Sequence, residues 1–74
     1  MRTFEDAAGR HWDVAVSEES YGSLRLLFAV RGGSELRAHV LEVSGRYAAE
    51  QLLLRLSDQE LRALLQASPA WRPG

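Results

Sequence analysis

The chain has 74 residues, of which nine are Lys or Arg and ten are Asp or Glu, giving a formal net charge of -1. This balance provides no long-range attraction to nucleic acid or to anionic lipid, and the longest apolar run is far below the roughly 20 residues that a membrane-spanning helix needs. The chain has no cysteine, which excludes disulfides and thiolate metal sites. We therefore expect a soluble cytoplasmic protein with no cofactor and no bound metal.

The N-terminal residues have the spacing of a β-hairpin. Segments 2–5 and 11–16 are short and β-prone, and apolar and polar side chains alternate along them. A three-residue loop that ends in Gly9 joins them, with glycine at the position that requires a positive φ. The resulting register sets Phe4 opposite Trp12 on one face, so turn chemistry and apolar alternation agree.

The next apolar segment, Leu24–Val30, has the alternation of a half-buried strand. Leu27 and Ala29 make its outward side less polar than usual, which favours a central strand over an edge strand. The segment before it, 17–23, is rich in acid, serine and glycine and predicts a surface loop.

The strand from Leu36 onward can pair with this central strand in two registers. A two-residue turn at the Gly32-Gly33 pair would set Phe28 opposite Arg37 and mix charged with apolar side chains on one face. A three-residue loop sets Phe28 opposite Leu36 instead, sorts the two faces, and places Gly33 at positive φ. We therefore predict the second register.

Strong helix formers dominate the C-terminal part of the chain. The tetrapeptide from Ser57 to Glu60 has the spacing of a capping box, in which the two side chains accept hydrogen bonds from each other's backbone N–H groups. We therefore predict two helices, about 46–56 and 58–67, with Pro69 ending the second.

Together these elements predict an α+β fold, an antiparallel four-stranded β-meander covered on one face by two C-terminal helices. Residues 1–68 would form a single domain and residues 69–74 a C-terminal tail. The expected core consists of the inward side chains of the strands and of the two helices: Phe4, Trp12, Val14, Val16, Leu24, Leu26, Phe28, Val30, Leu36, Ala38, Val40, Leu52, Leu56, Leu61, Leu64 and Leu65.

Two stretches resemble a pattern found in short uncharacterised bacterial proteins. One runs from Asp6 through Gly9-Arg10-His11-Trp12-Asp13-Val14, and the other is Leu-Ser-Asp-Gln-Glu-Leu at 56–61. Such proteins carry no assigned activity, so the resemblance implies no site residues.

The sequence contains no arrangement typical of a catalytic site. Gly-x-Ser-x-Gly and phosphate-binding glycine loops are absent. The adjacent Glu18 and Glu19 have no charged group placed opposite them. Neither His11 nor His39 has an orienting partner or a nucleophile placed by spacing. We therefore expect no enzymatic activity and no small-molecule ligand.

A different class of function follows from the outward side of the sheet. In the predicted register Arg25, Arg37 and His39 share that side, and a basic sheet face can hold single-stranded nucleic acid. No aromatic side chain accompanies them for base stacking, and the chain is not basic. Weak binding of single-stranded nucleic acid is therefore the second alternative, behind protein interaction.

Protein association is the alternative that we favour from the sequence. Tyr47 and Leu54 fall one heptad apart on the helix face away from the core, and Leu27 belongs to an apolar outward sheet face. Either Trp71 in the tail folds back over Leu54, leaving a monomer, or these side chains meet another protein or a second copy. We expect a small non-catalytic interaction or assembly domain, acting as a homodimer or with a protein partner, with contacts at Tyr47, Leu54, Trp71 and Leu27.

Overall fold

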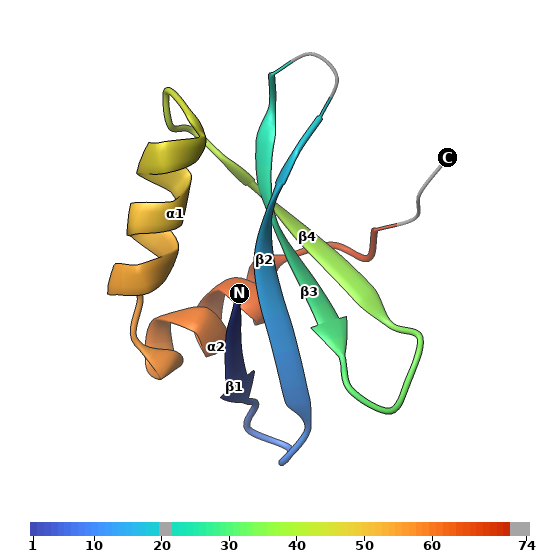
Figure 1. Ribbon diagram of the computed structural model, residues 1–74. Helices are drawn as coiled ribbons and strands as arrows, with labels where there is room; N and C mark the ends of the chain where they lie inside the picture. Colours follow the sequence, from blue (N-terminus) through green and yellow to red (C-terminus); the bar gives the residue numbers. More distant parts are fainter. Residues whose placement is uncertain (20–21, 72–74) are drawn as a thin grey trace.

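A computed structural model describes residues 1–19 and 22–71. Four strands form one antiparallel sheet in chain order, and two helices cover one face of it (Figure 1). This confirms the predicted α+β meander. Part of the predicted loop (Ser20 and Tyr21) and the end of the predicted tail (72–74) lie outside the described residues. The elements are β1 Arg2–Glu5, β2 His11–Glu18, β3 Leu24–Val30, β4 Leu36–Leu41, α1 Arg46–Arg55 and α2 Asp58–Ala67.

The β1–β2 hairpin has the predicted register, with Phe4 opposite Trp12. The backbone N–H of Asp6 donates to the carbonyl of Arg10 at 2.8 Å, and Gly9 has a φ of 87°, as the three-residue loop requires. β2 is longer than predicted, because the two residues after the expected end still pair with β3.

The predicted register between β3 and β4 is wrong by one residue. Phe28 lies opposite Arg37 rather than opposite Leu36. The glycine in the left-handed conformation is accordingly Gly32, with a φ of 80°, rather than Gly33. A shift of one residue moves every side chain of β4 to the other face of the sheet.

The shift explains where the burial of β4 differs from the prediction. Val40, predicted to lie in the core, faces away from the helices and is 59% exposed. Leu41 lies opposite Leu24 instead and is buried on the helix side. Arg37 and His39 occupy the other two positions of β4 on that side.

A charged side chain is tolerated on the helix side because it has polar partners there. Arg37 Nη1 donates to the carbonyl of Leu65 in the last turn of α2 at 3.2 Å, and Nε donates to Glu35 Oε2 at 2.8 Å. The last carbonyls of a helix have no intrahelical donor, and Arg37 supplies a donor to one of these carbonyls from outside the helix.

Each helix buries one narrow apolar face. α1 packs against β2 and buries Ala49 and Leu53, while α2 packs against β1 and β4 and buries Leu61 and Leu65. In the described part of the chain, neither helix has the length and apolar character needed to span a bilayer. The buried cluster consists of Phe4, Trp12, Val14, Val16, Leu24, Leu26, Phe28, Leu41, Ala49, Leu53, Leu61 and Leu65.

The junction between the two helices is held by two sets of hydrogen bonds. The predicted capping box is present, with the Ser57 hydroxyl accepting from the Glu60 backbone and the Glu60 carboxylate accepting from the Ser57 backbone. From the sheet, Arg2 donates to carbonyls at the end of α1, including that of Leu53 at 2.9 Å, and to Asp58 at 2.9 Å. The N-terminal strand is thereby fastened to both helices.

The segment after α2 runs back along the free edge of β4 (Figure 1). The backbone N–H of Ala38 donates to the carbonyl of Pro69 at 3.2 Å, and that of Trp71 donates to the carbonyl of Leu36 at 3.0 Å. Because opposite residues of an antiparallel pair share a face, this register places Trp71 beside Leu36, on the side away from the helices.

Candidate functional site

The face of the sheet away from the helices, here called the outer face, is apolar at its centre. An antiparallel sheet covered on one side usually presents polar side chains on the other. Here the central row consists of Ala15, Leu27 and Ala38, which lie opposite one another in three neighbouring strands. Further apolar side chains flank this row, and we call the whole set the outer patch: Ala15, Leu27, Ala29, Leu36, Ala38 and Val40.

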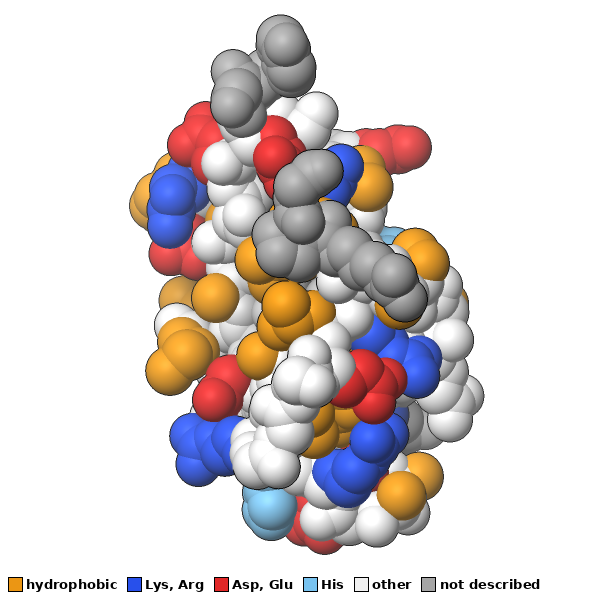
Figure 2. Space-filling model, turned by 90° about the vertical axis from the view of Figure 1, so that its right-hand side faces the viewer, with side chains coloured by type: hydrophobic (Ala, Val, Ile, Leu, Met, Phe, Trp, Pro, Cys, Tyr) orange, Lys and Arg blue, Asp and Glu red, His pale blue; other side chains and the backbone are white. Residues whose placement is uncertain are grey.

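Figure 2 looks at the molecule from the side opposite α1 and shows a group of apolar side chains near the centre of the view, with charged side chains to its left and right. Leu27 is flanked by two alanines, so it is the largest side chain of its row. Val40 is the most exposed large member, and Trp71 adjoins the patch at the β4 edge beside Leu36.

Each end of the outer patch carries an ion pair. At one end Arg25 Nη1 lies 3.4 Å from Glu19 Oε1, and at the other end Arg31 Nη2 lies 3.0 Å from Asp13 Oδ1. The Thr3 hydroxyl also donates to Asp13, at 2.8 Å. Hydrogen bonds from Arg31 and then from Thr3 hold the pKa of Asp13 below its usual value, so this carboxylate stays charged at neutral pH.

The structure brings two of the four predicted partner-binding residues together. Leu27 and Trp71 belong to the outer face, whereas Tyr47 and Leu54 lie on the solvent side of α1, where they are 78% and 68% exposed. α1 lies on the other side of the sheet (Figure 1), so Trp71 does not cover Leu54. The two pairs of residues form separate surfaces, and a single two-fold contact can use only one of them.

The basic cluster predicted for the outer face does not form, because the register of β4 differs from the predicted one. Arg37 and His39 lie on the helix side, opposite residues of β3 whose side chains are buried there. Arg25 alone stays on the outer face, where it pairs with Glu19. Arg25, Arg37 and His39 therefore do not form one basic surface that a nucleic acid could contact.

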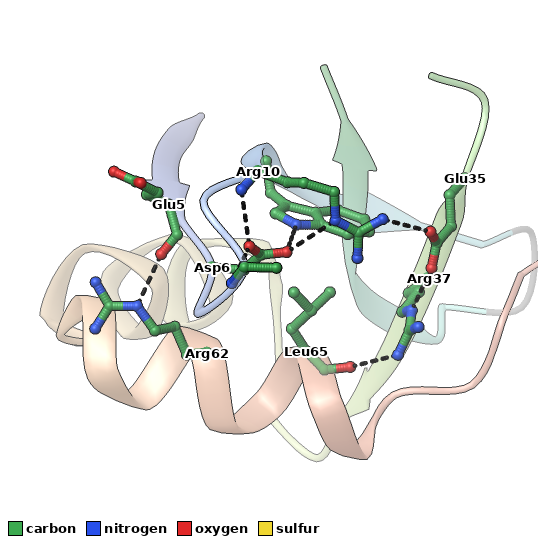
Figure 3. Close-up of polar contacts among 9 residues, drawn as sticks. Glu5, Asp6, Arg10, Glu35, Arg37, Arg62 and Leu65 are labelled. Carbon is green, nitrogen blue, oxygen red and sulfur yellow. Dashed lines mark hydrogen bonds and ion pairs between the residues drawn. The ribbon is translucent and has the colours of Figure 1, made fainter. Parts of the chain in front are cut away.

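A concave region that the sequence did not predict lies between the first hairpin, β4 and α2 (Figure 3). It is a cleft of about 190 Å³, with Arg10, Arg37 and Arg62 in its wall. Arg10 and Arg37 both contact Glu35, at 3.1 and 2.8 Å, and Arg62 Nε donates to the carbonyl of Glu5 at 2.7 Å. The cleft is smaller than the roughly 300–1,000 Å³ of most ligand sites, and its arginines already have protein acceptors. We interpret these contacts as the ones that hold α2 against the sheet.

Asp6 organises the hairpin end of this cleft. Its Oδ1 accepts from the backbone N–H groups of Ala8 and Arg10 at 2.9 and 2.8 Å, and its Oδ2 accepts from Trp12 Nε1 at 2.8 Å. The Arg10 guanidinium lies 5.1 Å from the centroid of the Trp12 ring. The indole donor, together with the backbone donors and Arg10, lowers the pKa of Asp6 from 3.8 to about 2.

This pKa shift predicts a component of acid sensitivity that belongs to Asp6. Since the folded protein holds the carboxylate in its charged form, its contribution to stability is complete above the unfolded pKa near 3.8 and is lost as the pH falls toward 2. We expect Asp6→Asn to have a lower melting temperature at pH 7 and a flatter decline of that temperature between pH 4 and 2. Thermal unfolding followed by circular dichroism at each pH measures the difference, and parallel pH profiles of the two proteins would contradict the assignment.

Within residues 1–19 and 22–71, no three His, Asp or Glu side chains are grouped so that they could hold a metal ion. Comparisons with protein-family models, with curated proteins and with solved structures found no match. We therefore infer function from the geometry of this molecule alone.

Proposed function

We propose that the chain is a protein-interaction domain that docks onto another protein surface through the outer patch. The observation that supports this most strongly is the apolar centre of a sheet face that neither helix covers. Ala38 is already buried, and Ala15, Leu27, Ala29 and Leu36 are half-buried, so a second surface laid over the patch would remove from water the exposed part of Val40 and what remains accessible of the others. Each square ångström of apolar area removed from water in this way favours association by about 25 cal/mol.

The distribution of charge around the outer patch also supports docking of a protein. Specific interfaces commonly have an apolar centre with charges at the rim. The Arg25–Glu19 and Arg31–Asp13 pairs lie at the two ends of the patch, away from the central row. Rim charges in such positions set the orientation of the partner and the rate of encounter more than the affinity.

The exposed side of α1 is the competing surface. It presents Tyr47 and Leu54, with Glu50 and Gln51 between them. Single exposed apolar side chains are ordinary on soluble proteins, whereas the outer patch is a continuous set drawn from three strands. We therefore assign the docking to the outer patch rather than to α1.

A photo-crosslinker at the centre of the outer patch tests this function. Replacing Leu27 with p-benzoylphenylalanine and irradiating cells that naturally produce the protein should give covalent adducts to protein, because that side chain would lie within the interface. The same replacement at Leu54, on α1, is the matched control and should give few adducts. Gel electrophoresis and mass spectrometry of the adducts measure the yield and identify the captured chain.

The outcomes separate the two surfaces. Adducts at position 27, whether with a second copy or with another protein, support the proposed function. Adducts at position 54 without any at position 27 would move the docking surface to α1. The absence of protein adducts at both positions would contradict the proposal.

A further inference from the structure

We propose that the outer patch docks onto a second copy of the chain, with the two sheets stacked face to face and their strands antiparallel. The two-fold axis of this homodimer would cross β3 near Leu27. The inference rests on the proposed function, since it names the partner of the same surface. It is carried by the arrangement of charge at the two ends of the patch.

The two ends of the outer patch differ in the order of their charges. In the strand register Arg25 is one step from Leu27 on the outer face, and Asp13 in β2 lies one step in the other direction, opposite Ala29. Glu19, the acidic partner of Arg25, lies beyond it. Arg31, the basic partner of Asp13, lies beyond Asp13 at the start of the β3–β4 loop. Along β2 and β3 the charges on this face therefore read acid, base, apolar centre, acid, base, and Glu5 of β1 lies on the same face at the level of the last base.

This order is self-complementary for antiparallel stacking alone. A two-fold axis across the strands at Leu27 lays one end of the face over the opposite end of the second copy. Arg25 then lies near Asp13 of the second copy, and Glu19 near Arg31 of the second copy. An axis along the strands would instead lay Arg25 over Arg25 and Arg31 over Arg31. Like charges placed together in this way disfavour that parallel stacking.

The contact area indicates a weak dimer. With strands about 4.8 Å apart and outward side chains about 6.7 Å apart along a strand, the patch and its charged ends cover about 400 Å². A standard interface buries about 800 Å² per partner, so the dissociation constant should lie in the micromolar range or above, on the order of 1–100 µM. The alanines beside Leu27 allow a second sheet to approach to the usual separation of about 10 Å.

Complementary charge reversals test the stacking. In Arg25→Glu the two symmetric contacts with Asp13 of the second copy would bring acid against acid. In Asp13→Arg they would bring base against base. We expect each variant alone to dimerise at least about tenfold more weakly than wild type. An equimolar mixture should form a heterodimer with affinity near that of wild type, because both contacts then join opposite charges.

Sedimentation equilibrium from about 10 µM to about 1 mM, a range set by the expected affinity, measures these affinities. Circular dichroism shows that each variant is folded. Arg46→Glu, a charge reversal at an exposed position of α1, is the matched control and should leave dimerisation unchanged. The mixture is decisive, since a variant that failed to fold could not be rescued by the other.

Three results would overturn the inference. Wild type could be monomeric over the whole concentration range, the single variants could dimerise as wild type does, or the mixture could stay monomeric. Of these, a monomeric wild type leaves the proposed function standing if position 27 still captures a different protein. The absence of any protein adduct at position 27 would contradict both the homodimer and the proposed function.

Discussion

Replacing Phe28 with alanine should lower the free energy of unfolding by about 3–5 kcal/mol, the usual cost of removing a large aromatic side chain from a core. Phe28 has no exposed surface, and its ring meets that of Phe4 edge to face, with centroids 6.1 Å apart. A domain of this size has a total stability of about 5–15 kcal/mol, so the loss is a large part of the whole. Urea unfolding measured by tryptophan fluorescence should show a much lower midpoint.

Val40→Ala is the matched control for this experiment, and it also tests the register of β4. In the predicted register Val40 would lie in the core, whereas in the structure it faces away from the helices and is 59% exposed. We expect the substitution to change the stability of the monomer by less than about 0.5 kcal/mol, as exposed positions usually do. A cost near that of a buried valine would contradict the observed register.

Adjacent leucines on α1 provide the second large effect. Leu53 is 2% exposed and lies in the core, whereas Leu54 is 68% exposed. Leu53→Ala should cost about 2–5 kcal/mol. Leu54→Ala should be nearly neutral, because leucine and alanine are both good helix formers and little buried surface is removed. Since the two changes are chemically identical and lie in one helix, their difference reports packing alone.

Chemical denaturation at low protein concentration, where association does not contribute, measures both variants. Equal losses for the two leucines would mean that α1 is rotated from the orientation described, or that its outer side is covered in the free protein. A loss confined to Leu54→Ala would reverse the two faces of the helix.

The first hairpin and the helix junction were predictable because two local signals agreed at each. At the hairpin, the position of Gly9 and the pairing of Phe4 with Trp12 require the same register. At the junction, Ser57 and Glu60 have a spacing that helices use to begin. Such signals act over a few residues, so the rest of the fold does not alter them.

The β3–β4 register was not predictable in this way, because the glycine pair permits either loop. Sorting apolar and charged side chains onto separate faces favours the three-residue loop only if Arg37 must face water. In the folded protein Arg37 faces the helices instead, because the carbonyl of Leu65 at the end of α2 accepts a hydrogen bond from it. The two residues are 28 positions apart, and no local pattern links them.

The candidate surface was predictable in part. Leu27 is predictable because the outward side of its strand is apolar, and this feature depends on β3 alone. The contribution of β4 to the patch, through Leu36, Ala38 and Val40, needed the correct register. The place of Trp71 at its edge needed the pairing of the tail with β4, for which the sequence after Pro69 carries no signal.

The contacts of Arg2 also bear on the timing of folding during synthesis. Its hydrogen bonds reach the carbonyls of Leu53 and Leu56 and the carboxylate of Asp58, which are 51, 54 and 56 residues further along the chain. The first strand is therefore translated well before the groups that anchor it. At a translation rate of about 5–20 residues per second, the strand waits on the order of 3–10 seconds for its anchor. The nascent sheet therefore keeps a loosely held edge until the start of the second helix has been made, and a chain released before that point cannot close it.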